Sequence, residues 1–182
     1  MIHNVYTDIT THLANNNRRC RGFEKISFNQ YVKDVGIERY ELAEDYLDIK
    51  LPRRATEKSA GYDIYSPCFF QLVPGETIKI PTGIKVYMQD NEVLQIYIRS
   101  SLGFKYDVVL SNSTGIIDAD YYNNPNNEGS IWIKLINHGD KTLEIDKGEA
   151  FAQGIFSTYL VTDGDKPVAE ERTGGIGSTN IN

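Results

Sequence analysis

Beyond Pro52 the chain alternates between short apolar runs and clusters of turn-forming residues. The runs are rich in Val, Ile, Tyr and Phe, and clusters of Gly, Pro, Asn and Asp interrupt them about every ten residues. No helical period is sustained in this part, so the pattern predicts an all-β domain, a jelly roll or distorted β-barrel. The predicted strands are residues 61–66, 68–73, 76–80, 84–88, 93–99, 107–111, 115–118, 130–136, 142–145 and 150–160.

Before Pro52 the hydrophobic pattern is helical. Ser27 and Gln30 have the spacing of a capping box, and the apolar residues that follow share one helical face. We therefore predict a helix from residue 27 to about residue 35, and a second, weaker helical turn over residues 38–46. Together they would form a short N-terminal helical extension of the β domain.

Both ends of the sequence are polar. Residues 1–20 are rich in Asn and Thr and end in a basic cluster, and from Thr162 the chain is again polar. Neither end has a hydrophobic period, so both are expected to be flexible arms. The predicted organisation is an N-terminal arm over residues 1–20, a β domain with its helix over 21–161, and a glycine-rich arm over 162–182.

Charge and composition exclude several classes of partner. With a formal net charge of −6 and a pI of about 5.1, the chain lacks the broad basic surface that nucleic acid requires. No apolar run has the length of a signal peptide or a membrane span. Cys20 and Cys68 match no metal or redox spacing and are expected to be free thiols in a cytoplasmic protein. His3, His12 and His138 are too scattered to predict a histidine metal site.

Residues 111–122 carry the densest candidate chemistry. Gly115 is predicted to take a positive φ or to pass close to a ligand, and Ile116 and Ile117 would anchor the next positions in the core. Asp118 would then project from rigid backbone, where a carboxylate can act as a general base toward water. The same composition also fits an ordinary Asp-rich turn between two strands.

Two further segments have compositions that suit phosphate. Residues 172–179 read Arg-Thr-Gly-Gly-Ile-Gly-Ser-Thr, which combines a cationic fork with unshielded backbone N–H groups and hydroxyls. Residues 99–103 read Arg-Ser-Ser-Leu-Gly and follow a predicted strand. Without a ligand, the first would be a flexible tail and the second a turn at the end of a strand.

Taken in order, these segments resemble the motifs of the trimeric dUTP diphosphatase (dUTPase) family. The matching segments are residues 59–65 (Ser-Ala-Gly-Tyr-Asp-Ile-Tyr), 99–101 (Arg-Ser-Ser), 115–121 (Gly-Ile-Ile-Asp-Ala-Asp-Tyr), 148–153 (Gly-Glu-Ala-Phe-Ala-Gln) and 172–179. The resemblance covers roughly residues 51–179. The insertion at 124–129 (Asn-Pro-Asn-Asn-Glu-Gly) and the segment 21–24 are similar to a branch found in Gram-positive bacteria and their phages.

The resemblance implies hydrolysis of dUTP to dUMP and pyrophosphate, which lowers dUTP and supplies dUMP for thymidylate synthesis. It implies that Asp118 activates the attacking water, that Asn112 reads uracil, and that Tyr121 packs on the deoxyribose and excludes a 2′-hydroxyl. The other substrate contacts that it implies are Arg99, Ser100, Ser101, Gly115, Gln153, Arg172, Gly174, Gly175, Ile176, Gly177 and Ser178.

The resemblance also implies a cofactor and an oligomer. In the family, Mg²⁺ is held mainly by the triphosphate and water, and Asp63 matches an aspartate near the metal side of the site. Family sites are assembled from three subunits, so we expect a homotrimer in which a lone chain is inactive. Ile176 stands where the family usually has a Phe stacked on uracil, which leaves the affinity for the base open.

Two other functions remain open from the sequence. A dCTP deaminase shares the fold and an Arg-Ser-Ser motif, but its catalytic glutamate would fall where this chain has Lys134. A lysine cannot take that role as written. The second alternative is a protein that keeps the fold but binds an unidentified protein partner. The intact Asp118 and Tyr121 argue against a loss of catalysis, although not against a second role.

Overall fold

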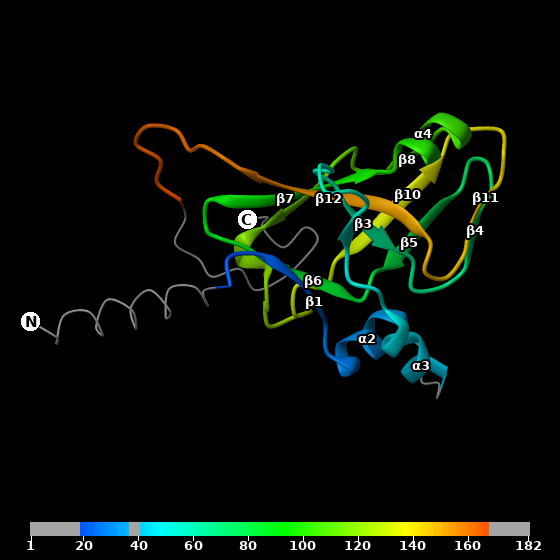
Figure 1. The fold of residues 1–182 in the computed structure, drawn as a ribbon, viewed down its shortest axis with the longest axis horizontal. Coiled ribbons are helices and arrows are strands. Elements are labelled where there is room, and N and C mark those ends of the chain that lie inside the picture. Colours follow the sequence, from blue (N-terminus) through cyan, green and yellow to red (C-terminus); the bar gives the residue numbers. More distant parts are fainter. Residues whose placement is uncertain (1–18, 37–40, 168–182) are drawn as a thin grey trace, which may run out of the picture.

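Antiparallel strands make up most of the computed structural model, which describes residues 19–36 and 41–167 (Figure 1). The strands are β1 (Gly22–Lys25), β2 (Arg53–Arg54), β3 (Tyr62–Tyr65), β4 (Phe70–Leu72), β5 (Thr77–Pro81), β6 (Ile84–Tyr87), β7 (Glu92–Ile98), β8 (Val108–Leu110), β9 (Gly115–Asp118), β10 (Trp132–Asn137), β11 (Leu143–Ile145) and β12 (Ala150–Thr158). The helices are α2 (Phe28–Val35), α3 (Glu41–Asp48), α4 (Ser100–Tyr106) and the short 3₁₀ helix η1 (Ala119–Tyr121). The predicted all-β class and its N-terminal helical extension are confirmed.

The largest sheet has the strand order β2-β3-β12-β7-β9, and a second sheet has the order β5-β10-β8. Two further pairs, β1-β6 and β11-β4, complete the described strands, and every pairing is antiparallel. Side chains from several sheets meet in one apolar core, among them Leu94 of β7, Ile133 of β10 and Phe151 of β12. Because β7 pairs on both edges, its position is fixed from two sides.

Each strand predicted beyond Pro52 is present, with ends that move by one or two residues. The prediction missed β1 and β2. Each is a short edge strand that exists because a partner pairs with it: Gly22 lies opposite Tyr87 of β6, and Arg53 lies opposite Asp63 of β3. Pairing of this kind leaves no periodic signal in four residues or fewer.

The helix predicted from residue 27 is confirmed as α2, and the second helical turn corresponds to α3, although residues 37–40 lie outside the described residues. The Ser27 hydroxyl accepts a hydrogen bond from the Gln30 N–H at 3.1 Å, as an N-cap should. A capping box also needs a hydrogen bond from the Ser27 N–H to the Gln30 side chain. That bond does not form, so this part of the prediction is wrong. The Gln30 side chain donates to Asp34 at 2.7 Å, and the Ser27 N–H donates to Glu128 at 2.9 Å.

Residues 100–106 form α4, which sequence analysis did not predict as a helix. The segment is short and contains Gly103, and Leu102 is its buried residue. Asp107 ends the helix in the left-handed region, with φ +51°, and its N–H donates to the Leu102 and Gly103 carbonyls. A helix fixed by one buried leucine has no apolar stripe for pattern analysis to detect.

Neither Cys20 nor Cys68 forms a disulfide, as the cysteine spacing predicted. In the part of the chain that the structure describes, no helix is long and apolar enough to cross a membrane. Residues 159–167 are exposed after β12 ends, while the division of the chain into two arms and a β domain stays a prediction.

The loop over residues 122–130 folds back onto η1 and packs closely against it. Gly129 has φ +81°, and a Cβ added there would lie 2.5 Å from the Tyr121 carbonyl oxygen and 3.2 Å from the Tyr122 Cα. Both neighbours are backbone atoms, which cannot move aside as a side chain can. The loop and η1 therefore form one tightly packed unit.

We expect Gly129→Ala to lower the free energy of unfolding by about 2 kcal/mol or more, because left-handed backbone strain is added to a backbone clash. Gly36 is the matched control: its φ is +72°, but a Cβ there would meet nothing within 4 Å. Gly36→Ala should cost only about 1 kcal/mol. Urea denaturation measures both, and equal losses would show that the loop is free to shift away from Tyr121.

Candidate active site

Asp118 stands at the end of β9 and is exposed. β9 pairs with β7 in a register that sets Asp118 opposite Val93 and Gly115 opposite Ile96. Asp118 has extended backbone, with φ −80° and ψ 159°, where the strand gives way to η1. Its side chain is thus carried by a paired strand rather than by an isolated loop, as predicted.

Of the two alternatives predicted for Gly115, the positive φ is not observed, and a close approach to a ligand stays a prediction. A Cβ on Gly115 would lie 3.1 Å from Cβ of Ile96 on the neighbouring strand. The prediction that Ile116 and Ile117 are both anchored in the core is wrong. Ile117 packs against the core, but Ile116 is 54% exposed. In a strand, successive side chains point to opposite faces, so the two isoleucines could not both be buried on one side.

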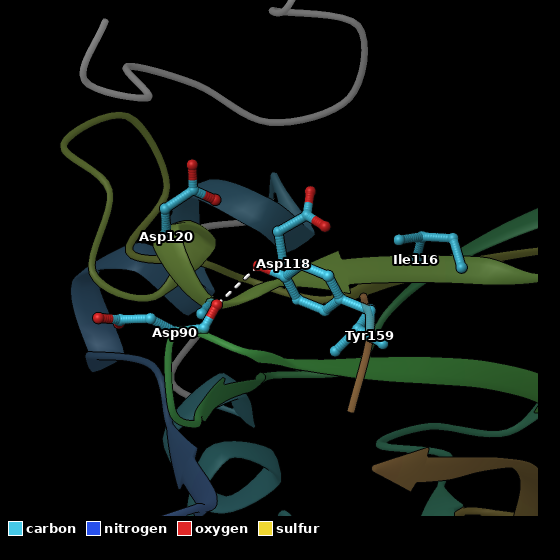
Figure 2. Close-up of a pocket in the computed structure, with 7 residues that line it drawn as sticks. Asp90, Ile116, Asp118, Asp120 and Tyr159 are labelled. Carbon is cyan, nitrogen blue, oxygen red and sulfur yellow. Dashed lines mark hydrogen bonds between the residues drawn. The ribbon is translucent and has the colours of Figure 1, made fainter. Parts of the chain in front are cut away.

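A pocket surrounds Asp118, lined by Asp90, Val93, Ile116, Ala119, Asp120 and Tyr159. Figure 2 shows Asp118 and Asp120 projecting to the same side of the ribbon, with Tyr159 below Asp118 in this view. The Tyr159 hydroxyl donates to the Asp90 carbonyl at 2.6 Å. Asp90 and Tyr159 were not predicted as site residues from the sequence, because neither belongs to a recognised motif.

Asn112 lines a second pocket, together with Ile96, Ile117 and Trp132. It is exposed in the turn after β8, where its carbonyl accepts from the Thr114 N–H at 2.7 Å. Ile116 lines both pockets. The pocket with the Asn112 amide and the pocket with the Asp118 carboxylate therefore share one exposed apolar side chain.

Tyr121 is buried, with 7% of its surface exposed. Its hydroxyl donates to the Ser130 carbonyl at 2.9 Å and accepts from the Asn127 side chain at 2.8 Å. The Asn124 side chain donates to the Tyr121 carbonyl at 3.0 Å. These hydrogen bonds fix the position of the ring, and the asparagines that make them were not identified from the sequence.

The arginine–serine cluster lies elsewhere, around β3 and β12. Arg99 follows β7, and its Nε lies 3.3 Å from Oδ1 of Asp63. Its Nη1 donates to the Ala150 carbonyl at 3.2 Å. Ser100 and Ser101 line the same pocket. Since a guanidinium has five N–H donors, most of the Arg99 donors remain available to an anion after these two contacts.

Gln153 completes this cluster. It pairs with Asp63 of β3 across the sheet, and its amide lies 3.4 Å from the Ile98 carbonyl, to which it donates. A Cβ on Gly61 would lie 2.4 Å from Oε1 of Gln153. Gly61 therefore leaves the space that Gln153 occupies, which gives a physical reason for glycine in the 59–65 segment.

The two clusters lie at opposite ends of β7. Asp118 is opposite Val93, near the start of the strand, and Arg99 follows its last residue. At the usual rise of a strand, Val93 and Arg99 are separated by about 20 Å. The described part of one chain thus brings Asn112 and Asp118 to one area and Asp63, Arg99, Ser100, Ser101 and Gln153 to another, and it does not join them.

Arg172, Gly174, Gly175, Ile176, Gly177 and Ser178 lie outside the described residues. Within residues 19–36 and 41–167, no group of three or more His, Cys, Asp or Glu side chains could hold a metal ion. The contact of Asp63 is with Arg99 rather than with other carboxylates.

An antiparallel β fold that carries an exposed carboxylate and, apart from it, an arginine–serine cluster suited to phosphate has the groups that a hydrolase of phosphate compounds requires. Comparison with known proteins narrows this class. The dUTPase family model matches residues 48–180, and the chain belongs to the dUTPase family.

Two relatives and one solved structure illustrate the relationship. The chain is 52% identical over 132 residues to the deoxyuridine 5′-triphosphate nucleotidohydrolase of Lactococcus lactis, covering 72% of this chain and 88% of the relative. With the enzyme of the same name from Serratia proteamaculans it shares 38% identity over 113 residues, or 60% of this chain and 70% of the relative. The crystal structure of dUTPase from Streptococcus mutans is 40% identical, with a TM-score of 0.62 over 79% of this chain and 99% of that one.

A more distant structure shares the fold. A mutant dUTPase from phage phi11 of S. aureus, described with a coordinated structural Mg(II) ion, is 21% identical to this chain, with a TM-score of 0.58. The likeness covers 84% of this chain and 98% of the phage protein. The Lactococcus and Streptococcus matches agree with the Gram-positive branch that the insertion indicated.

Proposed function

We propose that this protein hydrolyses dUTP to dUMP and pyrophosphate. The observation that carries the proposal is the position of Asp118, exposed at the end of a paired strand in a chain of the dUTPase family. A general base must reach the proton that it removes, and an exposed carboxylate on a fixed backbone can do so. Asp118 would accept a proton from the water that attacks the triphosphate.

The neighbouring groups suit a deoxyuridine. The Asn112 amide has both a donor and an acceptor, as the edge of uracil does, and the exposed Ile116 offers apolar surface to the ring. The buried ring of Tyr121 would pack on the deoxyribose and leave no room for a 2′-hydroxyl. Gly115 would let backbone and base approach without an intervening side chain.

The cluster around Arg99 would bind the phosphates. Arg99 offers charge and several N–H donors, Ser100 and Ser101 offer hydroxyls, and Gln153 offers an amide to a phosphate or its water. Asp63 would act by holding the Arg99 guanidinium in place, since these two groups are 3.3 Å apart. We further propose that Arg172, Gly174, Gly175, Ile176, Gly177 and Ser178 close over the triphosphate.

Mg²⁺ would be bound mainly by the triphosphate oxygens and water. Among the described residues, no group of three or more His, Cys, Asp or Glu side chains could hold a metal ion by itself, so the proposed ligands are those of the substrate and water. The carboxylate near the phosphate cluster is Asp63, which could contact the hydrated ion without replacing its ligands. When bound, the ion would neutralise negative charge on the phosphates.

The separation of the two clusters supports a shared site. A triphosphate held by Arg99 could not also reach Asp118, which lies opposite Val93, about 20 Å from Arg99 along β7. We therefore propose a homotrimer in which one copy supplies Asp118 and Asn112 and another supplies Arg99 and its neighbours. Closed rotational symmetry would produce three equivalent sites.

Asp118→Asn is expected to reduce the turnover of dUTP by several orders of magnitude while the protein still folds and binds nucleotide, because an amide cannot accept the water's proton. Pyrophosphate release measures the turnover, and calorimetry measures the binding. Ammonia release from dCTP, assayed in parallel on the wild type, would instead indicate a deaminase. Turnover within tenfold of wild type would remove Asp118 from the role of base.

Complementation between two inactive variants tests the shared site. Oligomers refolded from equal amounts of Asp118→Asn and Arg99→Ala chains should regain up to about a quarter of wild-type turnover, since each intact residue is present at a given position in half the copies. If both residues of a site came from the same chain, no mixed site would be intact. The control, Asp118→Asn mixed with the Asp118→Asn/Arg99→Ala double variant, should stay inactive.

A further inference from the structure

The 122–130 loop holds Tyr121 from one side. As described above, Ser130 and Asn127 bond the Tyr121 hydroxyl, and Asn124 bonds its carbonyl. The Asn124 carboxamide oxygen also accepts the Asn127 N–H at 3.2 Å. Both ends of the Tyr121 residue, ring and backbone, are therefore fixed by this loop.

The N-terminal segment holds the same loop from the other side. The Glu128 carboxylate accepts hydrogen bonds from the Ser27 N–H, at 2.9 Å, and from the Ser27 hydroxyl. The Ser130 hydroxyl donates to Asp34 of α2, and Ser130 is fully buried. Ser130 therefore links Asp34 directly to Tyr121. Glu128 links Ser27 to Tyr121 through Asn124, whose carbonyl accepts the Glu128 N–H at 2.9 Å.

The loop needs this support. Asn123 and Glu128 have φ values of 56° and 58°, and left-handed backbone costs a residue other than glycine about 1–2 kcal/mol. Burial raises the pKa of Glu128, but the hydrogen bonds from Ser27 and the charge of Lys85 outweigh it and leave the pKa below its ordinary value. Glu128 is therefore ionised near neutral pH, as an acceptor of two hydrogen bonds should be.

The contacts of the N-terminal segment lie outside the part of the chain that defines the family. The family model begins at residue 48, whereas Ser27 and Asp34 belong to the start of α2 and its last turn. Their contacts with the loop therefore join a segment outside the matched region to the site. A side chain can exclude a 2′-hydroxyl by steric contact only if it stays in place. A shift of about 1 Å at a reacting site has large effects on the rate.

We propose that Ser27 and Asp34 are positioning residues that act through Glu128 and Ser130 to fix the ring of Tyr121, and so set the discrimination between deoxyribose and ribose. The inference rests on the proposed function, because it takes Tyr121 as the contact for the sugar. It assigns a role to the N-terminal helix and to the 124–129 insertion, which are joined by these bonds.

Two substitutions test the link at different points. Ser130→Ala removes the hydroxyl that reaches Asp34 but keeps the carbonyl that accepts from Tyr121, and Asp34→Ala removes the other partner. In each, the ratio of kcat/KM for dUTP to that for UTP should fall about threefold to tenfold, the effect of one hydrogen bond. The fall should come from faster use of UTP, and the double variant should be no worse than the stronger single one.

Lys147→Met is the matched control. Lys147 bonds Asp45 at 2.7 Å and Asp48 at 2.8 Å, so its loss removes two ion pairs to α3 of the same N-terminal segment and leaves the contacts of the 122–130 loop in place. The ratio should stay at the wild-type value in this variant. A merely structural role for Asp34 would lower the thermal midpoint and leave the ratio unchanged, and that result would overturn the inference.

The experiment distinguishes failure of the proposed function from failure of this inference. If the proposed function is wrong, the wild type itself does not hydrolyse dUTP. If this inference is wrong, the variants are active and their ratio of kcat/KM for dUTP to that for UTP is unchanged. The rate of amide hydrogen exchange in residues 119–130 measures how firmly the loop is held, and this measurement does not depend on turnover. Faster exchange in Asp34→Ala but not in Lys147→Met supports the link, and equal exchange in the wild type and Asp34→Ala refutes it.

Discussion

The register of β7 is the constraint on which the rest of the molecule depends. The strand is paired on both edges, with β12 and with β9, and its Leu94 and Ile96 are almost completely buried. A slip by one residue would turn these side chains out of the core, so the register is strongly specified. The same register sets Asp118 at one end of the strand and Arg99 beyond the other. Burial of two apolar residues thus fixes the separation of the two groups with the clearest chemical roles.

In the arginine–serine cluster, the Asp63–Arg99 ion pair serves to orient the guanidinium rather than to stabilise the fold. The Asp63 and Arg99 side chains are 17% and 37% exposed, and ion pairs of this kind contribute little to folding. What the pair provides is a guanidinium held at one place, with Ala150 fixing a second of its nitrogens. A polyphosphate carries more charge than one carboxylate and can use the donors that remain. A weak ion pair therefore suits a group that must exchange partners.

The N-terminal segment is built into the domain rather than attached to it. β1 adds to β6, Ile26 and Tyr31 are in the apolar core, and the Tyr46 hydroxyl donates to the Ile26 carbonyl at 2.8 Å. Hydrophobic burial supplies the stability of this contact. The polar bonds to the 122–130 loop then operate from a rigid base, which is the condition for a positioning role.

The sequence by itself determined the elements whose signals are local, and only the tertiary structure decided the features that depend on a distant partner. Alternation and turn residues located the strands beyond Pro52, the Ser27 cap located α2, and the residue types around Asp118 and Arg99 indicated their chemistry. Hydrophobic periodicity and helix capping depend on residues that are close together in the chain, so both can be recognised from the sequence. The tertiary structure paired β1 and β2 with other strands, formed α4, exposed Ile116 and joined Ser27 to Glu128. It also placed Asp118 far from Arg99. Each of these outcomes is settled by packing between residues that are far apart in the sequence, and neither residue alone carries the information.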